Sequence, residues 1–287
     1  MEQYLRLLKE VRDHGHRQAN RTGIDALVLP YGSMMRFDLA DGFPAMTTKR
    51  LVFNSVKGEL IGFLRGCTNA AEFRALGSKV WDQNANENAA WLANPNRKGT
   101  DDTGRIYGAQ WRSWKAGDGS TRDQLRTVLD LIHNDPTSRR MIISAWRPDE
   151  FDRMCLPPCH VLYQFSVSIE TREINLCLYQ RSADMFLGVP FNIASASTLL
   201  HIVSRITGYT PRYFTHFLAD AHIYVNHLSQ VDEQLTRTPR RLPRLVLDVP
   251  TYERAGFSPQ LVDTIEPGQI HLEGYDPHPV IRAEMAV

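Results

Sequence analysis

Two neighbouring segments decide the fold: Val161-Leu162-Tyr163-Gln164-Phe165-Ser166-Val167-Ser168-Ile169 and Ile174-Asn175-Leu176-Cys177-Leu178. In both, an apolar side chain stands at every second position. Successive side chains of a strand point to opposite faces of its sheet, so this spacing predicts two strands that each bury one face. Only residues 170–173 lie between them. We therefore expect the two strands to pair as an antiparallel hairpin.

Helical spacing surrounds this hairpin on both sides. Apolar residues recur every three or four positions and predict helices at 4–11, 55–64, 69–76, 125–132 and 193–206. The segments 26–29 and 34–37 flank the turn-forming run Pro30-Tyr31-Gly32-Ser33, which predicts a second hairpin. Residues 84–105 have no sustained period and are expected to form a long loop. Without a repeat or linker, this mixture predicts one domain of helices and strands over residues 1–287.

The chain is balanced in charge. Its 287 residues include 33 basic and 32 acidic side chains, a formal net charge of +1, and 43% are hydrophobic. This balance argues against DNA or membrane binding through bulk charge. No apolar signal core opens the chain and no stretch approaches the ~18 apolar residues of a membrane span, so we expect a cytoplasmic protein. The four cysteines form no CxxC pair, which favours reduced thiols and no metal site.

One cysteine has unusual surroundings. Cys159 follows two prolines in Leu156-Pro157-Pro158-Cys159-His160, and the prolines stiffen its approach. A thiolate attacks far better than a thiol, so we expect nearby arginines to lower the pKa of Cys159. Twenty residues later, the run from Tyr179 to Asn192 supplies an arginine, a hydroxyl, a carboxylate and an amide among apolar neighbours. Together the two segments suggest a nucleophile that faces an anionic, hydrogen-bonding substrate.

Further motifs appear in a fixed order along almost the whole chain. They are Asn20-Arg21-Thr22-Gly23, Phe43-Pro44-Ala45-Met46-Thr47-Thr48-Lys49-Arg50, Glu59-Leu60, Tyr107-Gly108-Ala109-Gln110-Trp111-Arg112, Asp135-Pro136-Thr137-Ser138-Arg139-Arg140, Pro158-Cys159-His160, the run from Gln180 to Asn192, His222-Ile223-Tyr224 and Gly274-Tyr275-Asp276-Pro277-His278-Pro279. Each alone is weak, but their order is highly specific. In these motifs the chain resembles the thymidylate synthase family.

The resemblance implies a reaction and an architecture. The reaction is the reductive methylation of dUMP by 5,10-methylenetetrahydrofolate, which yields dTMP and dihydrofolate without a metal. The fold implied is α+β, a single domain with a large twisted mixed β-sheet flanked by helices. The sheet would pack against its twin in a homodimer, with Arg139 and Arg140 contributed to the partner's site.

The resemblance also assigns roles to single residues. Cys159 would add to C6 of the pyrimidine, Glu59 would act through water on O4 and the folate, and Tyr107 would help to remove the C5 proton. The implied catalytic set is Cys159, Glu59, Tyr107, Asp184 and Arg181. The implied substrate-binding set is Arg21, Arg139, Arg140, His160, Gln180, Arg181, Ser182, Asn192, His222 and Tyr224. The implied folate-binding set is Lys49, Trp81, Leu156, Asp184, Leu187, Gly188, Phe191 and Ala286.

The substrate-binding set divides by chemistry. Guanidinium groups bind a phosphate dianion with two aligned N–H donors, which suits the arginines of the set. Asn192 presents one donor and one acceptor, which complement O4 and N3–H of uracil. His222 and Tyr224 resemble the family pair that binds the ribose 3′-hydroxyl. Lys49 would meet the glutamate tail of the folate.

The sequence departs from the family pattern mainly where we expect folate contacts. Asn84 and Gly62 stand where tryptophan is frequent, and Gly58 and Val52 stand where histidine is common. These departures leave open a pyrimidine-nucleotide 5-hydroxymethylase acting on dUMP or dCMP, in which water instead of hydride traps the methylene. A non-catalytic nucleotide- or RNA-binding regulator is a further alternative, against which the retained Cys159 argues.

Overall fold

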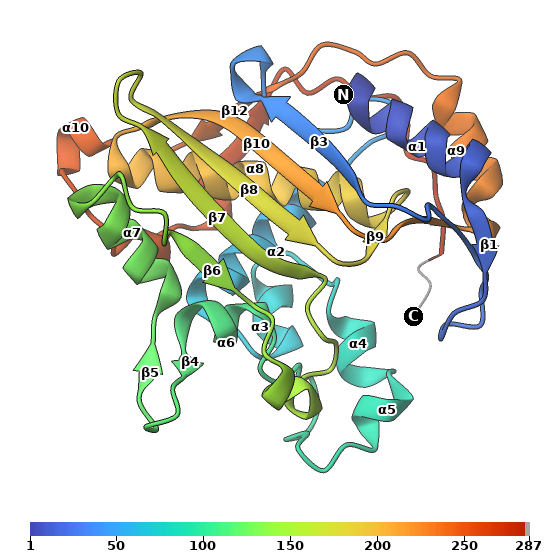
Figure 1. The fold of residues 1–287 in the computed structure, drawn as a ribbon, viewed down its shortest axis with the longest axis horizontal. Coiled ribbons are helices and arrows are strands. Elements are labelled where there is room, and N and C mark those ends of the chain that lie inside the picture. Colours follow the sequence, from blue (N-terminus) through green and yellow to red (C-terminus); the bar gives the residue numbers. More distant parts are fainter. Residues whose placement is uncertain (285–287) are drawn as a thin grey trace.

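The computed structural model describes residues 1–284, and its centre is a five-stranded sheet (Figure 1). The strand order is β3-β10-β8-β7-β6, with bounds β3 Ser33–Asp38, β10 Thr210–Leu218, β8 Glu173–Gln180, β7 His160–Ser168 and β6 Ile142–Ser144. Strands β7 and β8 are antiparallel and place Val167 opposite Ile174, so the predicted hairpin is confirmed. Only β10 and β8 run parallel, which makes the sheet mixed.

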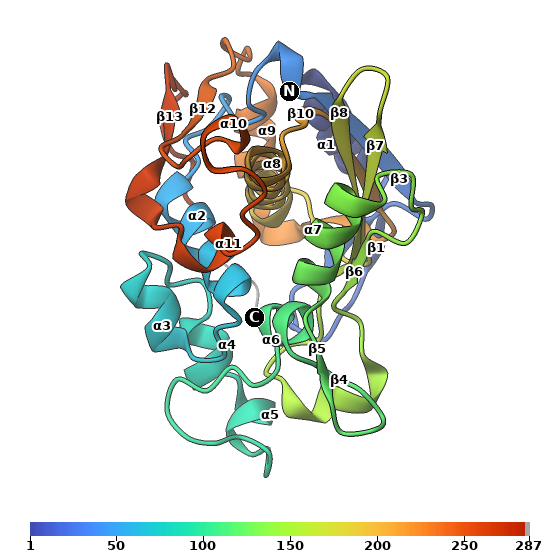
Figure 2. The same ribbon diagram turned by 90° about the vertical axis from the view of Figure 1, so that its left-hand side faces the viewer.

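Helices cover one face of this sheet (Figure 2). The long helix α8 (Gly188–Thr207) packs on β8 and β10, and α2 (Phe53–Arg65) and α7 (Gln124–Asn134) pack on α8. Helix α8 is buried nearly all round and ends at Gly208, whose φ of 77° suits a residue without a side chain. The opposite face of the sheet exposes a row of large apolar side chains. Met34, Phe217 and Tyr179 occupy neighbouring positions on β3, β10 and β8.

A second sheet has the order β1-β2-β11-β9 and contradicts one prediction. Its strands are β1 His16–Gln18, β2 Ala26–Val28, β11 Ala221–Tyr224 and β9 Ala183–Asp184. The segments 26–29 and 34–37 were predicted to pair as a hairpin, and this is wrong because β2 pairs with β1 and β11 while β3 pairs with β10. Pro30 has no N–H to donate at the corner, and the consecutive strands β10 and β11 offer each segment a separate partner.

The five predicted helices are confirmed, although residues 84–105 hold more structure than expected. Helix α1 spans Glu2–His14 and α3 spans Ala70–Ala75, the latter capped by Asn69. Within the predicted loop the chain forms the end of α4 (Asp82–Asn86) and the short helix α5 (Ala89–Leu92). Asn88 caps α5 by accepting from two backbone N–H groups, and Trp91 is buried. Asparagines that indicated a loop are in part helix caps.

Shorter elements complete the chain. The remaining helices are α6 Tyr107–Arg112, α9 Leu228–Leu235, α10 Tyr252–Ala255 and α11 Leu261–Thr264, with 3₁₀ turns at Leu39–Asp41, Pro148–Arg153, Val225–His227 and Pro267–Gln269. The remaining strands pair as β4 Trp114–Lys115 with β5 Thr121–Arg122, and as β12 Arg244–Leu247 with β13 Ile270–Glu273.

One connected core of buried side chains extends from Tyr4 to Ile281. The arrangement of a mixed sheet with helices packed on it confirms the predicted α+β class. Over residues 1–284, none of the helices combines the length and the apolar character needed to cross a membrane.

Candidate active site

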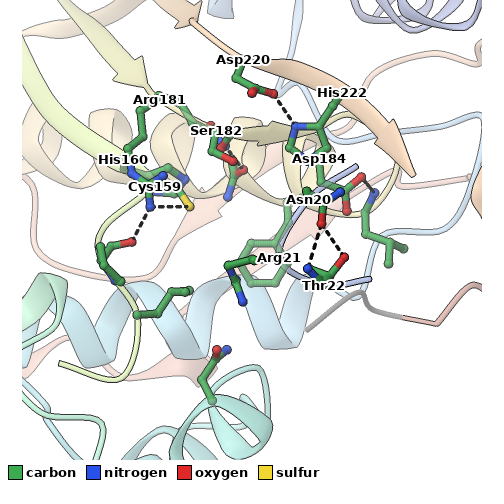
Figure 3. Close-up of a pocket in the computed structure, with 18 of the residues that line it drawn as sticks. Asn20, Arg21, Thr22, Cys159, His160, Arg181, Ser182, Asp184, Asp220 and His222 are labelled. Atoms are coloured by element: carbon green, nitrogen blue, oxygen red, sulfur yellow. Dashed lines mark hydrogen bonds and ion pairs between the residues drawn. The ribbon is translucent and has the colours of Figure 1, made fainter. Parts of the chain in front are cut away.

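A cavity of about 830 Å³ opens where the ends of β8, β9 and β11 meet α2 and α4. It brings together most of the residues predicted from sequence. Those that line it are Arg21, Glu59, Trp81, Tyr107, Leu156, Cys159, His160, Gln180, Arg181, Ser182, Asp184, Leu187, Gly188, Phe191, Asn192, His222 and Tyr224. Figure 3 shows Cys159, His160 and Arg181 close together on one wall, with Arg21 on the loop that faces them.

Cys159 stands on the turn that enters β7, and the two prolines before it have a definite structural task. The carbonyls of Pro157 and Pro158 accept hydrogen bonds of 2.9 and 2.8 Å from the Arg181 guanidinium. This holds Nη2 of Arg181 3.9 Å from the Cys159 Sγ. Burial raises the pKa of Cys159, and the charges of Arg181 and Arg21 oppose that rise. The expectation of a lowered thiol pKa is thus wrong for this arrangement, because desolvation outweighs the two cations.

Tyr107 holds the turn at Cys159 in place through its hydroxyl group. Its hydroxyl accepts the backbone N–H of Cys159 at 2.7 Å and that of His160 at 3.4 Å. Burial raises the pKa of Tyr107 well above its usual value, so the hydroxyl keeps its proton. With both backbone bonds made to its oxygen, that proton remains available toward the cavity. Burial lowers the pKa of His160 to about 4, which keeps its ring neutral.

Glu59 faces these groups from α2. The side chain is buried, and desolvation raises the pKa of Glu59 to about 8. The indole of Trp81 opposes this rise, although its N–H does not reach hydrogen-bonding geometry with the carboxylate or with any other described atom. A carboxyl group with such a pKa can both hold and release a proton near neutral pH.

The amide of Asn192 is held by its neighbours. The Gln180 Nε2 group donates to Asn192 Oδ1 at 3.0 Å and to the Ser182 carbonyl at 2.9 Å. On its other side, Gln180 Oε1 meets His216 Nε2 at 2.7 Å. His216 was not among the predicted site residues, and it stands behind the cavity lining on β10.

A histidine and an arginine loop occupy another end of the cavity (Figure 3). Asp220 Oδ1 lies 2.8 Å from His222 Nδ1. Burial acts to lower the pKa of His222, but this hydrogen bond and the charge of Asp184 raise it overall. Arg21 sits in a turn that Asn20 closes by accepting from Thr22 and donating to the Ile24 carbonyl.

Of four lining residues that were not predicted, three had weak sequence signals and one had none. Asp220 stands two positions before a predicted histidine, and Asn20 and Thr22 flank a predicted arginine. The centroid of the Trp146 ring lies 5.2 Å from the guanidinium carbon of Arg181, and the segment around Trp146 carried no motif.

Apolar side chains form the remaining wall. Leu156, Leu187 and Phe191 line it together with Trp81, and Asp184 accepts the backbone N–H groups of residues 186 and 187.

Lys49, which was predicted to bind the folate, lies outside this wall. It is buried at 6% exposure, donates to the Phe186 carbonyl and does not line the described cavity. Desolvation lowers the pKa of Lys49 to about 7.

Two more predicted residues lie elsewhere. Arg139 and Arg140 are exposed just before β6 and are not part of the lining that the structure describes. Ala286 lies outside the described residues. Among residues 1–284, no three histidine, cysteine or acidic side chains converge as a metal-binding group.

Two of the sequence departures prove to concern helix packing. A Cβ on Gly62 would lie 2.3 Å from the Phe73 ring, and one on Gly58 would lie 2.4 Å from the Leu76 carbonyl oxygen. Neither glycine lines the cavity, and Val52 is 60% exposed. Of the four departures, only Asn84 lines the described cavity, so it is the one that can contact a bound folate directly.

Comparison with known proteins agrees with this geometry. The family model described as thymidylate synthase matches residues 2–287. Proteins named thymidylate synthase from Pseudomonas syringae pv. tomato and Bordetella bronchiseptica are each 48% identical over 324 aligned positions, and the one from Pseudomonas putida is 49% identical. Each alignment covers 100% of both proteins. The chain therefore belongs to the thymidylate synthase family.

Proposed function

We propose that this protein methylates C5 of dUMP reductively, with 5,10-methylenetetrahydrofolate as donor of both the one-carbon unit and the hydride. The full-length match to proteins named thymidylate synthase supports this activity. The observation that carries it is the placement of the Cys159 thiol beside Arg181, with Tyr107 bonded to the Cys159 backbone and Glu59 lining the same cavity. The products are dTMP and dihydrofolate.

The nucleophile solves the central chemical difficulty. C5 of uracil is a weak nucleophile, and addition of the Cys159 thiolate to C6 converts C5 into an enolate carbon that can attack the folate methylene. Arg181 stabilises the thiolate against the desolvation that raises the pKa of the thiol. In the last step the thiolate leaves C6 again and the enzyme is regenerated.

Proton transfers fall to the groups around the ring. Glu59, with its pKa raised to about 8, acts through water on O4 of the pyrimidine and on the folate. The Tyr107 hydroxyl belongs to the hydrogen-bond network that removes the C5 proton: its oxygen is fixed by the N–H groups of Cys159 and His160, and its O–H can donate to a water that accepts that proton. Both roles are supported by the positions of these residues in the cavity lining.

The other lining residues bind the nucleotide. Arg21, Arg181 and Ser182 hold the phosphate, and Asn192 pairs with O4 and N3–H of uracil. His222 and Tyr224, whose rings lie 5.1 Å apart edge to face, bind the ribose hydroxyl. The hydrogen bond from His222 to Asp220 fixes the imidazole for that task.

The apolar wall binds the pterin ring of the folate. Trp81, Leu187 and Phe191 supply an aromatic and aliphatic surface, and the carboxylate of Asp184 lies at the same wall. Exclusion of water from this wall lets hydride, and not water, reach the exocyclic methylene.

We further propose a homodimer that shares its active sites. The exposed row Met34, Phe217 and Tyr179 supports this, because three large apolar side chains on one sheet face are typical of an interface. Arg139 and Arg140 are exposed at the β6 edge of the same sheet, where they can reach a partner's phosphate site.

Subunit exchange tests the shared site. Homodimers of Cys159→Ala and of Arg140→Glu should both be inactive, and mixing them should restore activity because one site of the mixed dimer is intact. Exchange is verified by mass spectrometry, with Arg254→Glu, an exposed arginine elsewhere, as the charge-matched control for Arg140→Glu. Absence of activity after proven exchange would show that Arg140 does not act across the dimer.

Product mass tests the reaction itself. Incubation of the protein with dUMP and methylenetetrahydrofolate should yield dTMP, with a rise in absorbance from dihydrofolate. Formation of 5-hydroxymethyl-dUMP with unoxidised tetrahydrofolate would contradict the proposal.

We also propose that residues 1–287 form one catalytic domain, which the single buried core supports. The cytoplasmic location stays a prediction.

A further inference from the structure

A partly buried carbonyl, that of Ser182, fixes the direction of the hydrogen bonds behind Asn192. The Ser182 carbonyl can only accept, and it lies 2.9 Å from the Gln180 amide, so the NH₂ end of that amide must face it. The second N–H of the same group is directed to Asn192 Oδ1. Both donors of Gln180 are therefore used within the protein, and Gln180 acts on a bound base through Asn192.

The same constraint determines the proton on His216. With its NH₂ end toward Ser182, Gln180 turns Oε1 toward His216 Nε2 at 2.7 Å, and an oxygen without a proton can only accept. Nε2 must therefore carry the hydrogen. His216 Nδ1 has no partner among the described atoms, which is tolerable for a bare lone pair and costly for a buried N–H. Burial lowers the pKa of His216 to about 3, so the ring stays neutral at working pH.

This chain determines which edge Asn192 offers to a base. Its Oδ1 faces Gln180, so its Nδ2 is directed away from Gln180. Uracil needs a donor opposite O4 and an acceptor opposite N3–H, whereas cytosine needs the reverse order. We propose that His216 is a positioning residue for base selection: its donation to Gln180 keeps the Asn192 amide in the orientation that suits uracil. The inference rests on the proposed action on dUMP.

Replacing the donor tests this role. His216→Phe keeps an aromatic ring beside Phe214 but leaves Gln180 Oε1 without a donor, and this unpaired oxygen favours release of Gln180. A released Asn192 can present either edge. We expect the ratio of kcat/KM for dUMP over dCMP, measured in competition, to fall about tenfold, and His216→Gln, which keeps an N–H donor, to restore much of it. A merely structural role would lower both values equally and leave the ratio unchanged, which would overturn the inference.

A matched control and a direct measurement complete the test. His201 on α8 is a second neutral, largely enclosed histidine outside the cavity lining, and His201→Phe should leave the ratio as in wild type. An equal fall in that variant would refute a specific role for His216. Nitrogen-15 NMR of the wild-type protein should show His216 protonated at Nε2, and a proton at Nδ1 would likewise refute it. If wild type makes no dTMP, the proposed function fails instead, and the tautomer measurement still stands.

Discussion

The nucleotide side and the folate side of the cavity are built in different ways. On the nucleotide side, Asn192, His222 and the Arg21 turn are held by hydrogen bonds to other protein groups. On the folate side, the Trp81 N–H has no partner among the described atoms. Glu59 is buried there, and the desolvation of its carboxylate raises its pKa to about 8. The hydrogen bonds of the nucleotide side are formed before substrate arrives, whereas the folate side keeps an unpaired polar group for its ligand. Changes to the nucleotide side should therefore alter recognition, and changes near the reacting atoms should alter turnover.

The strongest test of that division is the nucleophile itself. Cys159→Ser should lower turnover at least about 10³-fold, because a hydroxyl lacks the acidity needed to add to C6. The dissociation constant of dUMP, measured by calorimetry, should change less than about threefold, since its contacts lie on other residues. Cys177→Ser, a partly buried thiol on β8 outside the lining, is the control. Turnover within tenfold of wild type would refute the assignment of Cys159.

Glu59 tests the other side through both rate and stability. Glu59→Gln should reduce kcat roughly 10²-fold with little change in dUMP binding. Because the pKa of Glu59 is raised to about 8 in the folded state, the folded protein holds a proton that the unfolded chain has released above about pH 4.5. Wild-type stability therefore falls between about pH 4.5 and pH 8 through this group.

The Glu59→Gln variant has no carboxyl group at this position, so its stability does not fall with pH in this way. Its free energy of unfolding should exceed that of wild type by an amount that grows with pH, on the order of 4 kcal/mol at pH 8, and that vanishes near pH 4.5. Urea titrations at several pH values measure it. A difference that is constant with pH would mean that Glu59 is ionised in the folded protein at pH 7.

Base choice tests whether the nucleotide side is prearranged. Asn192→Asp offers a carboxyl group that can donate to N3 of cytosine and accept from its amine. The preference for dUMP over dCMP in steady-state competition should shift about thirtyfold toward dCMP, within the range expected for a two-bond base contact. Asn175→Asp on β8, an amide outside the lining, is the control. An unchanged preference would exclude the proposed pairing.

The smallest effect is expected at Asn84. Asn84→Trp adds an aromatic surface to the folate wall, and KM for methylenetetrahydrofolate should fall about threefold while KM for dUMP stays constant. Asn84→Ala should not reproduce the gain. If both KM values moved together, the two sides of the cavity would be coupled and not separately built.

Much of the site could be predicted because its residues lie in short motifs. Residues 180–192 supply the end of β8, all of β9 and the start of α8, so one segment predicts many neighbours. Lys49 shows the limit. Its motif is intact, but its rotamer and burial depend on Phe186. His216 lies in the middle of a strand where nothing nearby marks it as part of a hydrogen-bond chain.

In the fold, too, local features could be predicted from the sequence and long-range features could not. Alternation predicted β7 and β8, since their partner follows after a short turn. The hairpin predicted around Pro30 failed because each segment pairs with a strand almost 200 residues away, and local spacing cannot identify a distant partner. The lowered pKa expected for Cys159 failed for a similar reason. Desolvation depends on all the atoms that fold around the thiol, and residues adjacent in sequence do not determine it.

Gly62 influences the shape of the cavity without lining it. The ring of Phe73 fills the space where a side chain at position 62 would stand, and that ring in turn packs against Trp81 with centroids 6.1 Å apart. Any side chain at position 62 must displace Phe73, and the displacement passes to the indole of the folate wall. Gly62 and Phe73 thus influence the folate wall through Trp81, although neither of them lines the cavity. A larger residue at position 62 would therefore change the shape of the folate wall from behind, without contacting the ligand.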